Sequence, residues 1–315
     1  MKIVEYDMAD PLGVLNLNLL SLDYALTPER VALIRELDRR PFPFFALYAI
    51  EDGTVAGQVG VYRLPVMTTE GPEEVGSICA MCTHPAFSRR GIAAQLMDEA
   101  HKRMLAAGLR FSTLGTARHR GAYFLYRKQD YEDVFIPDSI FATYNRINPH
   151  ADRLRAERAD VKRLDDTDDI FRRIAANRLG FARRQNKFLT MLAVTGDLNA
   201  DDLWLFWFNN IPVGYAVAQV TGPVLNVSNL LLQEGVDAAE AIAALAQTLN
   251  FFYIRIRVDS PSVSNDLQRA GFYAKSPDWS VFMVKALRPH LTVEDARGLL
   301  GTGTQNFLIS WMDVT

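Results

Sequence analysis

The sequence of 315 residues contains only two cysteines, five histidines and no apolar run long enough to cross a membrane. Its first residues, MKIVEYDMADPLG, carry acidic side chains where a signal peptide would be basic and then apolar. These absences argue against export and against a membrane-spanning protein. We therefore expect a cytoplasmic protein without membrane association.

The sequence also lacks a strong excess of either charge, with a formal net charge of -3 and an isoelectric point near 6.0. A nearly balanced charge argues against nucleic acid as the natural partner. Hydrophobic residues make up 49% of the chain, which is long enough for two domains with complete cores.

Both cysteines lie in one short apolar segment, as Cys79-Ala-Met-Cys82. In an extended strand, residues three apart project to opposite faces, and no second Cys/His pair stands at the spacing of a zinc site. We therefore interpret both as small strand residues and expect no metal. A redox pair is the alternative interpretation.

A strand, a turn and a helix are predicted between Ile78 and about Ala107. Ile78 to Thr83 is short and apolar, Pro85 stops ladder hydrogen bonding, and Gly91 allows close approach of the backbone. After the turn, apolar residues recur every four positions, as expected for the buried stripe of a helix: Ile92, Leu96, Ala100 and Met104.

The beginning of this helix has the features of an anion site. Backbone N–H groups from about Arg89 to Ala94 have no partner within the helix, and they point outward with the positive end of its dipole. Arg89 and Arg90 flank them. A pyrophosphate group would bind there.

The segment Ser88-Arg-Arg-Gly-Ile-Ala93 resembles the acyl-CoA binding signature of the GNAT superfamily of N-acetyltransferases, although Ser88 stands where that family usually has Arg or Gln. The resemblance implies acetyl-CoA as co-substrate. The residues that it implies for acetyl-CoA binding are Met81, Cys82, Thr83, Ser88, Arg89, Arg90, Gly91, Ile92, Ala93, Ala94 and His119. The 3′-phosphate of CoA could meet Arg118, Arg120 or Lys128, although a solvated charged face is the alternative.

A second segment, His119 to Tyr131, is similar to another GNAT signature, Asn-x-x-Ala-x-x-x-Tyr-x-x-x-Gly-Phe. His119 stands at the Asn position, Asp130 at the Gly and Tyr131 at the Phe. Tyr126 falls where many family members carry a catalytic tyrosine, so the resemblance implies that role for it. The alternative is a core aromatic residue.

The order of the segments, together with the resemblance, implies an α/β fold (α+β, mixed sheet) built as two tandem GNAT domains. Residues 1–148 are expected to bind acetyl-CoA and to catalyse, and residues 151–315 to form a degenerate copy with a C-terminal tail. In the first domain a hairpin is predicted about Asp52-Gly53. A last strand at residues 139–146 is expected to close that domain, with the junction at 148–150.

The pattern of the first domain recurs after residue 151, but without its chemistry. A strand at 225–232 and a helix at 238–249 enclose the loop Gln233-Glu-Gly-Val-Asp237, whose two carboxylates would repel a pyrophosphate. Leu267 stands at the tyrosine position. The apolar tail at 306–312 is expected to dock, and the carboxylate of Thr315 could then reach the active site.

The expected reaction is direct attack of a neutral amine on the thioester. A backbone N–H near Met81 to Thr83 would stabilise the oxyanion, and Tyr126 would protonate the departing thiolate. The residues considered as general base are Glu73, Glu74, His84 and His119, with water as another possibility.

Two other functions stay open at this point. One is an acyl-CoA sensor without turnover. The other is a protein lysine or N-terminal acetyltransferase, in which the acidic loop at 68–74 forms a peptide groove. The acceptor, the acyl chain and the oligomeric state are left undetermined by the sequence.

Overall fold

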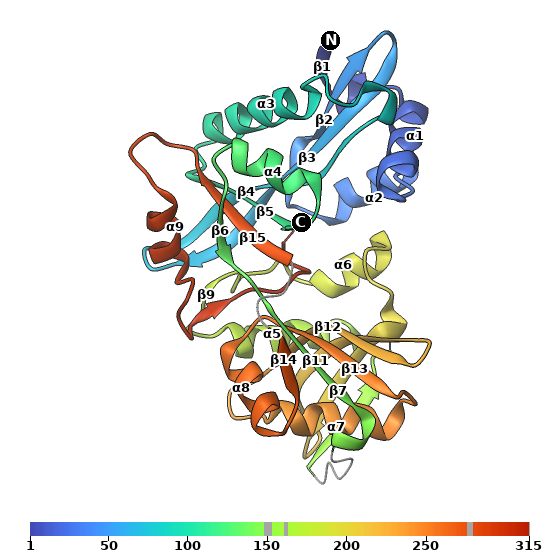
Figure 1. The fold of residues 1–315 in the computed structure, drawn as a ribbon, viewed down its shortest axis with the longest axis vertical. Coiled ribbons are helices and arrows are strands. Elements are labelled where there is room, and N and C mark those ends of the chain that lie inside the picture. The colour runs from blue at the N-terminus through green and yellow to red at the C-terminus, as the bar shows by residue number, and fades with distance from the viewer. Residues whose placement is uncertain (148–152, 161–162, 276–279, 315) are drawn as a thin grey trace. The chain divides into compact units, whose positions relative to one another are not determined.

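The computed structural model describes residues 1–147, 153–160, 163–275 and 280–314 (Figure 1). The chain forms two compact units, and neither is continuous in sequence. The first comprises residues 1–134, 281–300 and 313–315, and the second comprises 135–280 and 301–312.

The sheet of the first unit has the strand order β1-β2-β3-β4-β5-β15-β6. Its central strands β2, β3 and β4 form antiparallel pairs, whereas β4 and β5 are parallel. The predicted hairpin about Asp52-Gly53 is confirmed, because Glu51 pairs with Thr54. The strands are β1 (Lys2–Glu5), β2 (Pro41–Glu51), β3 (Thr54–Thr68), β4 (Gly71–Thr83), β5 (Phe111–Ala117), β6 (Glu132–Phe135) and β15 (Ser280–Ala286).

Helices α1 (Pro11–Leu22) and α3 (Ile92–Ala106) pack on opposite faces of this sheet. Gly57 of β3 faces α3, because an added Cβ would lie 2.8 Å from Cγ2 of Ile92. The next residue, Gln58, bonds to Asn18 of α1, and successive strand residues point to opposite faces. The other helices of the unit are α2 (Pro28–Leu37), α4 (Gly121–Lys128) and α9 (Val293–Leu300).

The predicted apolar stripe of α3 is confirmed. Ile92, Leu96, Ala100 and Met104 are all buried. Only a glycine at position 57 allows α3 to approach β3 so closely, and this contact fixes where the helix begins over the sheet.

The segment 65–74, which we expected to be a loop, belongs to two long strands instead. β3 continues to Thr68 and β4 starts at Gly71, with Val66 opposite Glu73. Pro65 does not end the strand, because Leu64 and Val66 on either side of it are buried in the core. The acidic residues of this hairpin are paired: Arg110 contacts Glu70 at 2.9 Å and Glu73 at 2.6 Å. These ion pairs offset part of the acidic charge of the hairpin.

The second unit repeats the strand order of the first. Its seven-stranded sheet runs β14-β7-β13-β12-β11-β10-β8, in which β12 and β13 are the parallel pair. The strands are β7 (Asp138–Thr143), β8 (Leu154–Arg158), β10 (Leu203–Phe208), β11 (Ile211–Thr221), β12 (Val224–Leu232), β13 (Tyr253–Val258) and β14 (Tyr273–Lys275). The helices are α5 (Asp166–Ala175), α6 (Phe188–Thr195), α7 (Ala238–Thr248) and α8 (Pro261–Arg269).

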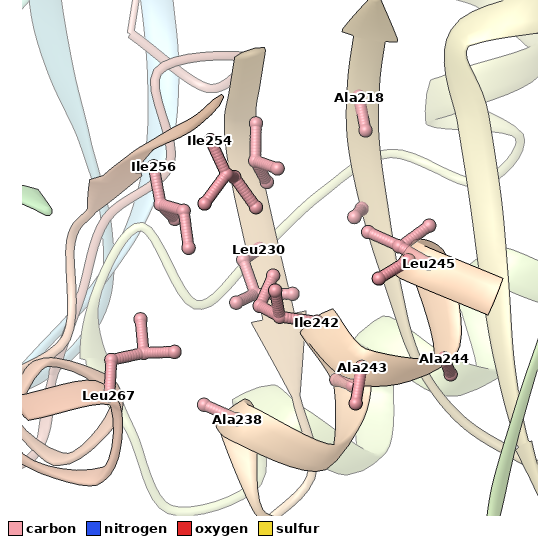
Figure 2. Close-up of a cluster of buried hydrophobic side chains, with 14 of the residues drawn as sticks. Ala218, Leu230, Ala238, Ile242, Ala243, Ala244, Leu245, Ile254, Ile256 and Leu267 are labelled. Atoms are coloured by element: carbon pink, nitrogen blue, oxygen red, sulfur yellow. The ribbon is translucent and has the colours of Figure 1, made fainter. Parts of the chain in front are cut away.

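The core of the second unit lies between α7, α8 and one face of this sheet. Figure 2 shows Ile242 and Leu245 of α7 near Ile254 and Ile256 of β13, with Leu230 of β12 among them. This aliphatic cluster explains why the second unit keeps the architecture of the first.

One strand position in each sheet is filled from the other half of the chain. β7, which we expected to close the first domain, lies between β13 and β14 in the second unit. In the first unit the corresponding place, between β5 and β6, is taken by β15. The reason is burial, since Ile140 and Ala142 of β7 belong to the second core.

The tail contains α9, which ends at Leu300, and the short strand β16 (Phe307–Leu308). β16 pairs in parallel with β9 (Leu179–Gly180) of the second unit. The expected junction at 148–150 and Thr315 lie outside the described residues. Among the described residues, no helix is long and apolar enough to cross a membrane.

Candidate active site

The N-terminus of α3 is open to a ligand. Its N-cap is Gly91, with φ of 78°, and no side chain caps the helix. Arg89 also has a positive φ, of 62°, so the backbone of residues 88–91 curls around the helix start. A backbone that alternates between negative and positive φ values presents successive N–H groups to an anion. The donors predicted from the sequence are therefore uncapped, and an acyl-CoA pyrophosphate fits the donor set.

Both loop arginines are solvent-exposed beside these donors. Arg90 lies over the Phe87 ring at 5.0 Å, and its closest carboxylate, on Glu51, is 3.6 Å away. An exposed pair at that distance contributes little, about 0–1 kcal/mol, so Arg90 remains able to meet a phosphate.

Strand β4 leads into this loop and leaves its neighbour β5 on the way. Pairing between the two strands is confined to Gly76 with Ser112 and Ser77 with Thr113. Beyond Ile78, β4 has no described ladder partner on the β5 side, although it remains paired with β3 as far as Thr83. A thioester can therefore approach backbone groups of the segment 79–83, which contains the predicted residues Met81, Cys82 and Thr83.

A β-bulge lies in the same segment. Cys82 is opposite Gln58 and Cys79 is opposite Gly60, so β4 holds one residue more than β3 there. Ala80 takes a φ of 45° within the bulge. The bulge redirects the backbone of β4 just before the phosphate loop.

Two buried amide side chains, on Asn18 and Gln58, hold the bulge, and neither was predicted from the sequence. Gln58 Nε2 donates to the carbonyl oxygen of Ala80 at 3.0 Å and to Asn18 Oδ1 at 2.8 Å. Asn18 Nδ2 donates in turn to Gln58 Oε1 at 2.7 Å. The available signal was the presence of amides in two apolar segments: Asn16 and Asn18 in LNLNLL, and Gln58 in AGQVGV.

The bulge also corrects our argument about the cysteines. Because their partners Gln58 and Gly60 are two residues apart on β3, Cys79 and Cys82 face the same side of the sheet rather than opposite sides. Neither cysteine forms a disulfide bond, and burial raises the pKa of Cys82 to about 12. Among the described residues, no group of His, Cys, Asp and Glu side chains could hold a metal ion.

Tyr126 lies on α4 and is the buried residue of that helix, with 7% of its surface exposed. Burial raises its pKa to about 12, to which Cys79 adds, while Arg120 lowers it. No described residue shares a hydrogen bond with its hydroxyl group. Phe124 beside it is exposed. A protonated, unshared hydroxyl near the two thiols of β4 suits donation to a ligand.

The position of Tyr126 is supported by Tyr131, whose N–H donates to the Tyr126 carbonyl oxygen at 3.1 Å. The two rings contact edge to face, 6.1 Å apart. The buried Tyr131 hydroxyl lies 2.6 Å from Ser112 Oγ of β5 and 2.9 Å from His101 Nε2 of α3. Tyr131 thus connects α4, which carries Tyr126, to α3.

The remaining predicted residues divide into paired and exposed ones. His119 is exposed in the turn between β5 and α4. Of the three cations considered for the 3′-phosphate of CoA, Arg118 pairs with Asp133 at 2.7 Å, whereas Arg120 and Lys128 are exposed. Among the residues considered as general base, Glu73 is occupied by Arg110 and His84 Nδ1 accepts from the N–H of Ala86 at 3.2 Å.

The corresponding helix start in the second unit is closed. Asp237 caps α7, and its Oδ1 accepts from the N–H groups of Ala239 at 2.7 Å and Glu240 at 3.3 Å. A carboxylate therefore occupies the donors that a pyrophosphate would need. Leu267, at the tyrosine position, is fully buried in the core.

Comparison with protein families finds a match at the first unit. The model of the acetyltransferase (GNAT) family matches residues 13–131, which include the phosphate loop, the bulge and Tyr126. A comparison with curated protein sequences finds no match.

Solved structures share the fold over most of the chain. A probable N-acyltransferase from Enterococcus faecalis has a TM-score of 0.69 at 13% identity, covering 91% of this chain and 72% of its own. A GCN5-related N-acetyltransferase from Kribbella flavida gives 0.63 at 15%, covering 91% and 72%. Eis1 from Mycobacterium abscessus gives 0.60 at 15%, covering 91% and 74%.

At these identities the structures show the two mixed sheets flanked by helices, and no more than the fold. The family match and the open helix start supply the class of activity, which is acyl transfer. Residues 13–131 are therefore similar to the acetyltransferase (GNAT) family, and the chain shares its fold with solved N-acetyltransferase structures.

Proposed function

We propose that the protein transfers an acetyl group from acetyl-CoA to the amine of a small molecule or peptide. The observation that carries the proposal is the uncapped start of α3, with two exposed arginines, at the point where β4 has parted from β5. The first unit, which differs from the predicted domain 1–148 because β7 lies in the second unit and β15 in the first, would bind the donor and catalyse.

The residues of the first unit would act as follows. The N–H groups at the start of α3 hold the pyrophosphate, with Arg89 and Arg90 beside them. A backbone N–H of the segment Met81–Thr83 donates a hydrogen bond to the thioester oxygen and stabilises the negative charge that develops there when the neutral amine attacks. Tight positioning of the two substrates supplies much of the rate.

Tyr126 would act on the leaving sulfur. Its raised pKa keeps it protonated at all physiological pH values. An ordinary thiol has a pKa near 8.5, so complete transfer from a tyrosine at about 12 is uphill. We therefore assign to Tyr126 a hydrogen bond to the leaving sulfur, which strengthens as negative charge develops there. The proton that converts the thiolate to a thiol then comes from the attacking amine.

The second unit would serve as a degenerate copy that binds no acetyl-CoA. The capped start of α7 and the carboxylates of its loop support this assignment. Calorimetric titration of the full chain with acetyl-CoA should then give one site per polypeptide. Two sites would contradict the assignment.

Turnover tests the proposal against its two alternatives. The full chain with acetyl-CoA should release CoA faster when small primary amines are added. A lysine peptide and a free N-terminal peptide belong in the same panel, because they represent protein acetylation. Binding of acetyl-CoA without any amine-dependent release would instead support a sensor.

A further inference from the structure

The second unit contains a cavity of about 430 Å³ where β12 ends and α7 and α8 begin. This is the place that corresponds to the phosphate loop in the first unit. All of the residues that line it belong to the second unit. The volume falls within the usual range for small-molecule sites, about 300–1,000 Å³.

The cavity has an apolar floor and an acidic rim. Ile174, Val263 and Phe307 line it and are themselves almost fully buried, so they present a dry surface. Glu234 and Asp237 are exposed at the loop before α7. The lining is thus about equally apolar and polar, a combination that suits a small molecule with both an apolar and a polar part.

The lining carries a net negative charge. Its two guanidinium groups are engaged, since Arg269 pairs with Asp266, and Arg178 donates to the carbonyl oxygen of Gln305. Three carboxylates against two guanidinium groups leave one negative charge in excess. No described residue forms an ion pair with Glu234.

We infer that this cavity binds a small amphipathic cation, an amine with an apolar body. The body would lie on the floor formed by Ile174, Val263 and Phe307, and the ammonium group would meet Glu234 and Asp237. At the α7 end of the cavity an anion is disfavoured, because the Asp237 carboxylate already occupies the N–H donors of that helix. The inference concerns the second unit alone and does not rest on acetyl transfer by the first.

Three probes with one apolar body test the charge preference: phenylpropylamine, phenylpropanol and phenylpropanoate. They are titrated into the full chain by calorimetry, without acetyl-CoA. The amine should bind about tenfold more tightly than the alcohol, and the carboxylate most weakly. Equal affinities, or tighter binding of the carboxylate, would overturn the inference.

Variants then locate the site. Glu234→Gln with Asp237→Asn removes both charges but keeps a capping side chain on α7, and it should reduce the affinity for the amine to that for the alcohol. Ser262→Trp, at an exposed position of the lining, should abolish binding of all three probes. Gly91→Asp, in the first unit, should leave amine binding unchanged. If the amine bound the two cavity variants as tightly as the natural chain, the inference would be wrong.

Discussion

The starts of α3 and α7 occupy the same place in two sheets of identical strand order, yet one is open and the other closed. At α3 the cap is a glycine without a side chain, and arginines stand beside it. At α7 the cap is Asp237, whose carboxylate takes the donors for itself. A single side chain at the cap thus separates a helix start that can hold an anion from one that satisfies itself, while the bulge and the parting of the strands are kept in both.

The bulge and the parting of strands show that the second unit preserved its scaffold. On β12 the register shifts after Asn229, so that Ala218 of β11 faces Val227, which leaves one extra residue as in β4. β12 pairs with β13 only from Val224 to Val227. The difference between the units therefore lies in chemistry rather than in architecture.

The largest expected effect comes from closing the α3 start. Gly91→Asp should lower the affinity for acetyl-CoA by about 100-fold or more, because unit charges about 4 Å apart near a protein surface repel by roughly 4 kcal/mol. Gly91→Asn is the matched control, since both residues tolerate a positive φ and only one is charged. Calorimetry should show less than about a tenfold loss for Asn. Equal losses for the pair would mean that shape, not charge, decides binding.

The second difference between the units is at the tyrosine position, where the first unit has Tyr126 and the second has Leu267. Tyr126→Phe should reduce kcat by roughly 10- to 1000-fold with little change in the KM for acetyl-CoA. Tyr123→Phe removes another hydroxyl from the same helix, one that donates to Asp133, and should leave kcat within about twofold. Steady-state kinetics distinguish the two, and an unchanged kcat in Tyr126→Phe would assign that residue to the core.

The buried amides test what the bulge contributes. Gln58→Leu should lower the free energy of unfolding by about 1–3 kcal/mol, because the amide oxygen of Asn18 loses its donor in the core, although Asn18 Nδ2 still donates to Val14. Replacing both residues by leucine should restore most of that stability. Turnover should stay low in the double variant, since the Ala80 carbonyl still lacks its donor. Recovery of turnover together with stability would show that the amides do not position the bulge.

His101 of α3 gives a smaller effect, in which the stability depends on pH. Helix α7 of the second unit has no histidine and cannot show this effect. Burial lowers its pKa to about 3. The unfolded chain, with an ordinary histidine pKa, takes up the proton first, so stability is full above about pH 6.5 and falls as the pH drops toward 3. In His101→Gln, the slope of the free energy of unfolding against pH, measured with urea, should decrease by up to about 1.4 kcal/mol per pH unit in that window. A slope identical to that of the natural chain would contradict a buried neutral His101.

The smallest effect concerns the cap of α7. Asp237→Ala should cost about 1 kcal/mol of stability, whereas Asp237→Asn should cost a few tenths at most. Neither should change the affinity for acetyl-CoA if the first unit alone binds it. Thermal unfolding and calorimetry of the two variants check both statements, and a gain of a second acetyl-CoA site in Asp237→Ala would show that the cap alone closes the second unit.

The local parts of the site could be predicted from the sequence, because their signals are local. The strand, the turn with Gly91 and the α3 stripe lie within one run of thirty residues, and backbone donors do not depend on which side chains surround them. The pairing of Arg110 with Glu73 and the burial of Tyr126 depend on neighbours distant in sequence, so they could not be read from it.

Two kinds of feature escaped the sequence for a stated reason. An extra residue in a strand leaves the apolar pattern almost unchanged but reverses the facing of everything beyond it, which is why the sides of Cys79 and Cys82 were misjudged. The destination of β7 was missed because an apolar strand such as Ser139-Ile-Phe-Ala-Thr143 suits a place in either sheet. The packing of both cores decides which of the two sheets contains this strand.

The exchanged strands set an order of events during synthesis. The first sheet has a gap between β5 and β6 until β15 (Ser280–Ala286) has been made. A ribosome-bound chain that has passed Val134 therefore cannot complete the sheet of the first unit, and contacts between strands so distant in sequence form slowly. The first unit must wait until the residues of the second unit have been synthesised.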